Sequence, residues 1–323
     1  MNNDYDKLIT EYRSFVGWNR KKFKSKYINI EGEYNSRKSF QQSLDDSTWF
    51  FGGSSVWGVG SSDYETIPSQ FAKVSSSKVM NFGEAGWNSR QSLNLLITLL
   101  RNDLKPNLII AFEGVNEIMH PCRSEINRIP TTSYEMRIKS LLTRYGFFNL
   151  LISKFIINSF IKFLIEPYQY LFYALNLSDH DINDPYKNMF NCKEDILKSN
   201  DIADELLNNW YSAYLLSKEK DIQFIAILQP HLYNSVSYIK HINFKLERRF
   251  EKPLNVVYPL IKNKIEEYCL IDKNFCESIL DATNWINTDK AVYLDYVHLS
   301  GDGNKIIAKE IYKNIKNIKN FKN

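Results

Sequence analysis

The sequence is poor in the residues that build metal sites and disulfide frameworks. Its 323 residues include only four cysteines and five histidines. No two cysteines form a Cys-x-x-Cys pair, and none stands at a metal-ligand spacing from a histidine. We therefore expect neither a metal nor another cofactor, and we expect Cys122, Cys192, Cys269 and Cys276 to be inert thiols in a reducing compartment.

Long apolar runs and dense charge are also missing. The first residues are polar and acidic, and no window has the roughly 18 consecutive apolar residues of a membrane span. This pattern predicts a cytoplasmic protein with neither a signal peptide nor a transmembrane segment. The net charge of +4 is too small to indicate a nucleic-acid partner. The most basic stretch, residues 20–26, is expected to be a solvated face.

What is present is an alternation of strand and helix patterns. Short apolar runs, typical of strands covered on both faces, occur at residues 48–52, 78–83, 107–114 and 222–230. Apolar residues at helical spacing occur at residues 89–104, 254–268 and 303–318. Such alternation predicts an α/β fold, a three-layer α/β/α sandwich around a central parallel sheet.

Two parts of the chain fall outside this alternation. Residues 1–45 are polar and irregular and are interpreted as an N-terminal extension. Residues 122–210 are too long for an ordinary crossover and are interpreted as an inserted, mostly helical cap. The catalytic core would then comprise residues 46–121 and 211–323.

One segment of the expected cap, residues 147–165, is unusually apolar and has a wide apolar helical face. We expect this face to pack against the rest of the protein. Peripheral membrane contact is the alternative, as is contact with a second subunit. The sequence does not define the oligomeric state.

Two short segments far apart in the chain could form one catalytic site. The run Phe-Gly-Gly-Ser-Ser at 51–55 places a serine after an expected strand, and Asp295-Tyr-Val-His298 lies near the C-terminus. A serine hydroxyl needs a base to take its proton, and the base needs a carboxylate to orient it. Ser54, His298 and Asp295 can fill these three roles; Ser55 is the alternative nucleophile.

Acyl transfer also needs hydrogen-bond donors for the oxyanion of the tetrahedral intermediate. Gly86, in a loop after the second strand, can bring its N–H close to a substrate because it has no side chain. The side-chain amide of Asn116, after the third strand, and the N–H of Ser54 can donate to the same oxygen. His120 and His231 also follow predicted strands and are candidate substrate contacts.

Four blocks in this order resemble the SGNH/GDSL hydrolase family: Gly-Gly-Ser54, a loop with Gly86, Gly-x-Asn116, and Asp295-x-x-His298. The resemblance covers the expected core and implies a flavodoxin-like fold with the catalytic and oxyanion residues named above. Two positions depart from the family pattern. Gly53 stands where the family usually has an aspartate, although some bacterial branches also have a glycine there. Glu117 replaces the aspartate of the third block.

The resemblance implies a serine esterase that removes an O-acyl group, expected to be acetyl, from a small-molecule or glycan ester. The carbohydrate substrate is suggested by bacterial proteins of the same family that act in surface-polysaccharide pathways. A carbohydrate O-acyltransferase with the same triad is one alternative, and a lipid-directed esterase that uses residues 147–165 as an interfacial lid is another.

Overall fold

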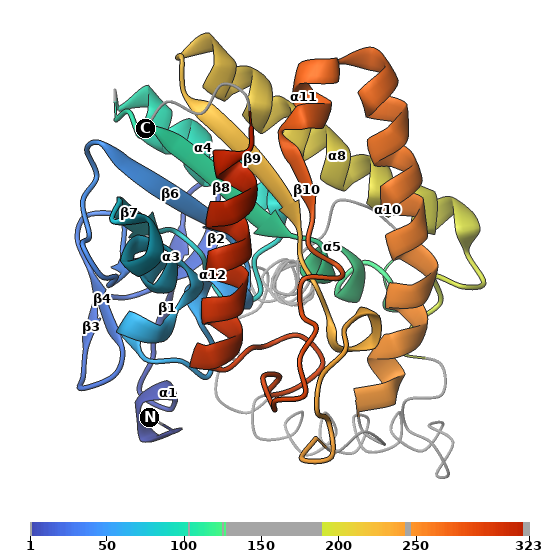
Figure 1. Ribbon diagram of the computed structural model, residues 1–323, viewed down its shortest axis with the longest axis horizontal. Coiled ribbons are helices and arrows are strands. Elements are labelled where there is room, and N and C mark those ends of the chain that lie inside the picture. The colour runs from blue at the N-terminus through green and yellow to red at the C-terminus, as the bar shows by residue number, and fades with distance from the viewer. Residues whose placement is uncertain (1, 103, 125, 127–188, 243–246, 319–323) are drawn as a thin grey trace, which may run out of the picture.

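A computed structural model describes residues 2–102, 104–124, 126, 189–242 and 247–318 of the chain. Its centre is an eight-stranded sheet with the strand order β10-β9-β8-β6-β7-β5-β4-β3 (Figure 1). The strands are β3 Phe23–Lys24, β4 Asn29–Glu31, β5 Ser36–Arg37, β6 Ser47–Gly52, β7 Lys78–Asn81, β8 Leu108–Glu113, β9 Gln223–Leu228 and β10 Ile279–Asp281. A separate hairpin pairs β1 Thr10–Arg13 with β2 Gly17–Arg20.

The α/β prediction is confirmed. Strands β6 to β10 pair in parallel, and the four apolar runs predicted as strands coincide with β6, β7, β8 and β9. Every residue of β6 and β8 is buried, as expected for central strands covered on both faces. The sheet is nevertheless mixed, because β5, β4 and β3 continue it beyond β7 in antiparallel order.

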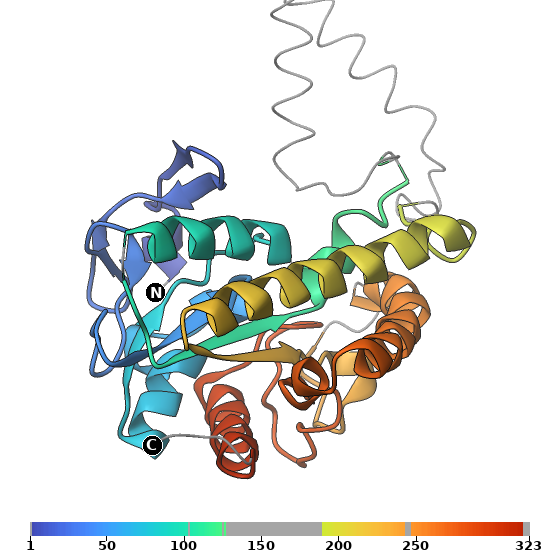
Figure 2. The same ribbon diagram turned by 90° about the horizontal axis from the view of Figure 1, so that it is seen from above.

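Helices cover both faces of the sheet, so the architecture has three layers (Figure 2). One face carries α4 Ser89–Arg101, α8 Ile196–Glu219, α10 Glu251–Ile271 and the short α11 Lys273–Glu277. The opposite face carries α3 Ile67–Ser75 and α12 Gly301–Lys316. Each face has its own apolar core, one around Trp49, Leu96 and Trp210 and the other around Phe50, Phe71 and Ile311.

Shorter helices stand at the ends of strands and in loops. They are α1 Asn2–Tyr5, α2 Ser54–Trp57, η1 Asp63–Glu65, α5 Val115–Met119, η3 Leu232–Asn234 and η4 Arg248–Phe250. Two of them, α2 and α5, directly follow β6 and β8. In a parallel sheet these carboxyl ends are where functional side chains gather.

Residues 1–45 contain more regular structure than the irregular extension expected from the sequence. They form β1 to β5, and three of these strands join the central sheet. The strands are only two to four residues long, too short to produce a readable alternation of polar and apolar residues. The proposed division into extension, core and cap stays a prediction, and α8 runs across its boundary at residue 211.

Most of the expected cap lies outside the described residues, including the apolar segment 147–165. The expectation that this segment packs against the protein therefore remains a prediction. No helix in the described part of the chain is long and apolar enough to cross a membrane.

The expectation of free thiols is wrong. Cys122 pairs with Cys192 and Cys269 pairs with Cys276 in two disulfides. The first bond joins residues 70 positions apart, and the second links the end of α10 to α11. Such pairing depends on the approach of distant or turned segments, which spacing alone does not reveal. Disulfides persist mainly in oxidising compartments, so these bonds weigh against the predicted cytoplasmic location.

Candidate active site

Ser54 is the first residue of α2, directly after the sharp turn that ends β6. Gly52 in this turn has φ +149°, and a Cβ there would lie 2.3 Å from the carbonyl oxygen of Phe112. Only glycine fits this conformation and this approach to β8. The turn places Ser54 at the carboxyl edge of the sheet, with its side chain partly exposed.

The neighbouring Ser55 points elsewhere. Its side chain is buried, and its Oγ lies 3.5 Å from Nε2 of Gln229, which donates to it. Ser54 Oγ, in contrast, lies 2.7 Å from Nε2 of His298. Of the two serines, only Ser54 has a histidine ring within hydrogen-bond distance.

His298 and Asp295 lie in the loop that precedes α12. Asp295 Oδ2 is 2.5 Å from His298 Nδ1, and Oδ1 accepts hydrogen bonds of 2.8 Å from the N–H groups of Val297 and His298. The carboxylate therefore fixes both the histidine ring and the turn that carries it. The serine, imidazole and carboxylate form a continuous hydrogen-bonded chain, which is the geometry that an activated nucleophilic serine requires.

The electrostatics of Asp295 suit this arrangement. Burial alone would raise the pKa of its carboxyl group, but hydrogen bonds and charge from His298, with the backbone N–H donors, outweigh burial and lower that pKa. Asp295 is therefore ionised at neutral pH. An ionised partner on Nδ1 holds the ring so that Nε2 faces the serine, and it stabilises the imidazolium that forms.

The loop with Gly86 and the residue Asn116 both lie close to the turn that carries Ser54. Gly86 has φ +80°, which favours glycine, and its loop is tied to β6 by a 3.1 Å hydrogen bond from the Glu84 N–H to the Gly52 carbonyl. Asn116 Nδ2 donates to the Trp87 carbonyl oxygen at 2.7 Å. The loop with Gly86 and the helix α5, which carries Asn116, thus touch each other beside Gly53 and Ser54.

The same contact explains the glycine at position 53. A Cβ on Gly53 would lie 2.3 Å from Nδ2 of Asn116 and 3.2 Å from the Trp87 carbonyl oxygen. A larger residue, such as the aspartate usual in the family, would displace the Asn116 amide. This departure from the family pattern is therefore matched to the packing of this site.

Glu117, the second departure from the family pattern, connects two segments of the site through hydrogen bonds. Its carboxylate accepts hydrogen bonds of 2.6 Å from the Ser89 N–H and 2.7 Å from the Gly114 N–H. The side chain is buried, and burial is the main cause that raises its pKa. Glu117 thereby links the start of α4 to the turn before α5, which carries Asn116.

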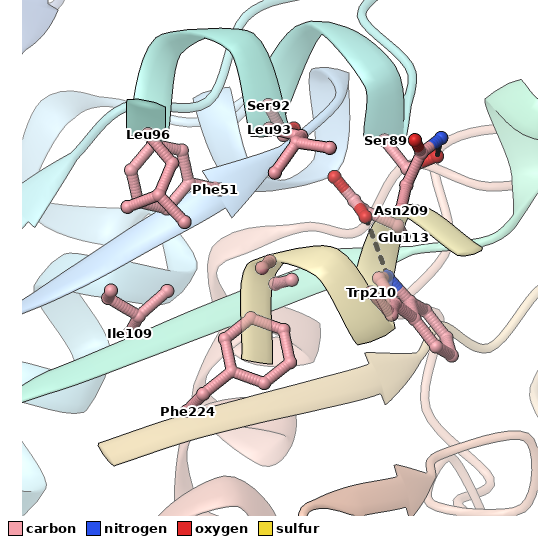
Figure 3. A pocket seen from close by; sticks show the side chains of 12 residues that line it. Phe51, Ser89, Ser92, Leu93, Leu96, Ile109, Glu113, Asn209, Trp210 and Phe224 are labelled. Atoms are coloured by element: carbon pink, nitrogen blue, oxygen red, sulfur yellow. Dashed lines mark hydrogen bonds between the residues drawn. The ribbon is translucent and has the colours of Figure 1, made fainter. Parts of the chain in front are cut away.

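A second buried glutamate, Glu113, lies next to it. Burial, followed by the charge of Glu117, raises the pKa of Glu113 to about 8, so it is protonated at neutral pH. Its Oε2 accepts a 2.7 Å hydrogen bond from Trp210 Nε1, while Oε1 has no partner in the described part of the chain (Figure 3). Glu113 lines a cavity of about 10 Å³ between the sheet, α4 and α8, and Ser54 is not among its lining residues.

The two candidate substrate contacts differ in exposure, because His231 is buried and His120 is partly exposed. His231 is 1% exposed; its Nδ1 accepts a 3.2 Å hydrogen bond from the Tyr233 N–H, and burial lowers its pKa to about 3. Burial also lowers the pKa of His120 to about 4, although the nearby Gly86 backbone opposes this shift, and Nε2 of the ring has no hydrogen-bond partner among the described residues. His120 lies near the loop of an expected oxyanion donor. A role of either histidine in substrate binding stays a prediction.

The structure adds residues that the sequence did not indicate. Arg20, the start of the basic stretch expected to be solvated, pairs with buried Glu84 near Gly86. Glu247 lies close enough to Asp295 for that charge to raise its pKa, after burial, and it accepts a hydrogen bond of 3.3 Å from the Tyr296 N–H. No local pattern marks these residues, because their partners are distant in sequence.

Among the described residues, no group of three or more histidine, cysteine, aspartate or glutamate side chains is arranged to hold a metal ion. What the arrangement can do chemically is nucleophilic attack by a serine, with general base assistance, beside the expected oxyanion donors. Such chemistry is that of a serine hydrolase, here on an α/β fold.

Neither a protein-family model nor a curated protein matches the sequence. Among solved structures, the chain is similar to a putative lipolytic protein of the G-D-S-L family from Desulfitobacterium hafniense DCB-2, with 10% identity, coverage of 84% of this chain and 99% of that chain, and a TM-score of 0.43. A G-D-S-L family lipolytic protein from Veillonella parvula DSM 2008 matches at 10% identity, with coverage of 83% and 96% and a TM-score of 0.45. An acetyl xylan esterase from the rumen bacterium Butyrivibrio proteoclasticus matches at 12% identity, with coverage of 84% and 64% and a TM-score of 0.40.

Two of these three structures are named as G-D-S-L family proteins, and the four sequence blocks resemble the same family. At such low identities and TM-scores, the similarities carry no argument about the function of this chain. The function proposed below rests instead on the chain's own residues and their geometry.

Proposed function

We propose that the protein is a serine esterase that hydrolyses an O-acyl ester, expected to be O-acetyl, on a carbohydrate. The observation that carries this proposal is the hydrogen-bonded chain from Ser54 Oγ through His298 to Asp295, with distances of 2.7 and 2.5 Å. A histidine between a serine and a carboxylate is the arrangement that makes a serine hydroxyl nucleophilic.

The reaction would proceed in two halves. Ser54 Oγ attacks the ester carbonyl carbon while His298 Nε2 takes the hydroxyl proton. The tetrahedral intermediate collapses as His298 returns that proton to the leaving sugar oxygen, which leaves an acyl-serine. Water then attacks the acyl carbon, gives its proton to the same histidine and releases the acid, and Ser54 recovers its proton.

The oxyanion would be held by the N–H groups of Ser54 and Gly86 and by the Asn116 amide. Asn116 Nδ2 carries two hydrogens, and one contact, to the Trp87 carbonyl, leaves the second for the substrate. Donors held in place before the reaction stabilise developing charge without reorganisation. Glu117 would support this by joining the start of α4, which follows the loop of Gly86, to the turn before α5, the helix that carries Asn116.

The carbohydrate part of the proposal comes from the resemblance to bacterial SGNH proteins of surface-polysaccharide pathways. The same residues would serve an O-acyltransferase, because a sugar hydroxyl can replace water in the second half-reaction. A lipid-directed esterase would need an interfacial surface. The candidate for that surface, residues 147–165, lies outside the described residues.

A fluorophosphonate probe tests the nucleophile directly. We expect intact-protein mass spectrometry to show one covalent adduct on the wild type and none on Ser54→Ala. Ser55→Ala is the matched control, since Ser55 is the adjacent serine and is buried away from His298; it should still be labelled. An adduct that persists in Ser54→Ala would overturn the assignment.

A series of p-nitrophenyl esters of increasing chain length tests the acyl group. Turnover should be greatest for acetate and should fall with longer chains. Turnover that rises with chain length and with added liposomes would favour the lipid-directed esterase. Adding a glycan acceptor separates the remaining alternatives, because acylated glycan in place of free acid would identify a transferase.

A further inference from the structure

Two arginines from the N-terminal region lie against the same tryptophan at the end of the nucleophile's helix. The guanidinium carbon of Arg20 is 4.4 Å from the centre of the Trp57 ring, and that of Arg37 is 4.2 Å from it. Trp57 is buried and is the last residue of α2, whose first residue is Ser54. The position of α2 therefore depends on residues far from the catalytic motifs.

Arg37 fixes Trp57 to the scaffold. Its side chain is fully buried and donates to the carbonyl oxygens of Trp57, Gly58 and Ser61 at 2.9, 2.8 and 2.6 Å. Its Nε also forms an ion pair of 3.2 Å with Asp63. These contacts hold the C-terminal end of α2 and the loop that follows it.

Arg20 makes a different connection, from Trp57 to the loop with Gly86. Its Nη1 pairs with Oε1 of Glu84, and its backbone N–H donates to Oε2 at 2.9 Å. The Glu84 side chain is 2% exposed, and Oε1 also accepts a 2.8 Å hydrogen bond from the Ala85 N–H. A carboxylate buried to this degree is costly without a cation beside it, so Glu84 needs Arg20 to keep this position.

The rest of the β1–β2 hairpin lies against the same segment, beside α4 (Figure 2). The indole N–H of Trp87 donates to the Trp18 carbonyl oxygen at 2.8 Å, and Gln91 Nε2 donates to the Val16 carbonyl oxygen at 2.9 Å. Trp87 in turn provides the carbonyl that accepts from Asn116. The hairpin thus contacts the segment that carries Gly86, and Trp87 of that segment links it to Asn116.

We propose that Arg20 is a positioning residue that sets the distance between the nucleophile and the oxyanion donors. It contacts Trp57 on the helix of Ser54 and Glu84 in the loop of Gly86, and so joins the two sides of the reacting centre. This inference rests on the proposed esterase function. Donors stabilise an oxyanion only when they are already aimed at it, and a shift of about 1 Å can cost about 100-fold in rate.

Arg20→Met tests the proposal, because methionine keeps an apolar stem near Trp57 but removes the charge and the donors. We expect kcat for p-nitrophenyl acetate to fall about 10- to 100-fold while KM changes less than about twofold, since a misplaced oxyanion donor acts in the transition state. Arg20→Lys keeps a cation beside Glu84 and should recover part of the lost kcat.

Arg13→Met is the matched control. Arg13 is on the same hairpin, donates to the Tyr34 carbonyl oxygen at 3.0 Å and has its guanidinium carbon 5.6 Å from the Tyr34 ring centre, contacts that involve neither α2 nor the loop with Gly86. Its kcat should stay near the wild-type value. Equal losses of kcat in Arg13→Met and Arg20→Met would mean that the hairpin merely supports the fold, and would overturn the proposal.

Hydrogen exchange measured by mass spectrometry gives a readout that does not depend on turnover. Exchange in the peptide covering residues 84–87 should rise in Arg20→Met and in Glu84→Gln, but not in Arg13→Met. Unchanged exchange and kcat in Arg20→Met would overturn the positioning role. Absence of Ser54-dependent labelling or turnover in the wild type would instead overturn the proposed function, and the exchange result would still decide whether Arg20 holds the loop.

Discussion

Two carboxyl groups near the reacting centre, Asp295 and Glu113, have opposite protonation states although neither is fully exposed to water. Asp295 sits at the carboxyl edge of the sheet and accepts two backbone N–H groups and the ring of His298. Glu113 is the last residue of β8 and is much more deeply buried, with Trp210 as its donor and Glu117 as a neighbouring carboxyl group. The pKa of the first is lowered and that of the second is raised.

The difference shows that backbone donors alone do not overcome full burial, since the pKa of Glu117 is raised although it accepts two of them, whereas Asp295 also has the histidine partner His298. Burial opposes ionisation in both places, but hydrogen bonds to the charged form reverse its effect only at Asp295. The edge of the sheet thereby holds a charge ready to orient a base. The buried end of β8 holds the neutral carboxyl group of Glu113, which helps to fill the space between β8 and α8. We expect Asp295 and its hydrogen-bonded partners to control turnover, and we expect the buried Glu113 to affect stability.

The largest effect is expected when Ser54, His298 or Asp295 is replaced. Ser54→Ala and His298→Ala should each lower kcat by about 10⁴- to 10⁶-fold, and the double variant should be little worse than either, because such residues act as a unit. Asp295→Asn should keep more residual activity than either. Steady-state kinetics of the four variants measure this, and additive losses would show that the residues do not work together.

Asn116 should have the next largest effect. Asn116→Ala is expected to lower kcat by about 10²- to 10³-fold with little change in KM, because an oxyanion donor acts mainly in the transition state. Kinetics with p-nitrophenyl acetate measure both constants. A change confined to KM would make Asn116 a substrate-binding residue instead.

The raised pKa of Glu113 can be tested by measuring the melting temperature as a function of pH. Because the folded pKa of Glu113 is raised to about 8, its contribution to stability is fully present below the ordinary glutamate value, declines as pH rises, and is lost above about 8. Glu113→Gln cannot titrate. The melting temperature of the wild type relative to Glu113→Gln should therefore fall between about pH 4.5 and 8. Parallel melting curves would contradict the raised pKa.

The smallest effect should be the opposite pH dependence of stability at Asp295. The lowered pKa of Asp295 means that its contribution to stability is present above the ordinary aspartate value and is lost as pH falls through the folded value. Asp295→Asn should thus melt at a lower temperature than the wild type at neutral pH, and the two should converge in acid. Ser54→Ala serves as the control, since it should follow the wild-type profile. A constant gap at all pH values would show that the variant acts through packing.

The sequence alone was sufficient for the core of the fold and for the order of the site blocks. Strands buried on both faces, such as β6 and β8, need apolar residues at every position, so they stand out as apolar runs. Tight turns next to functional side chains need glycine, so Gly52 and Gly86 mark the loops of the site. These signals are local, and they are legible without a structure.

Only the tertiary structure decided which partners these residues have. The contacts from Ser54 to His298, Arg20 to Glu84 and Glu113 to Trp210 join residues 244, 64 and 97 positions apart. The disulfide between Cys122 and Cys192 and the strands from residues 1–45 that extend the sheet are non-local in the same way. Charge states and pairings depend on what the folded chain brings within a few ångströms, and no local spacing in a single sequence contains that information.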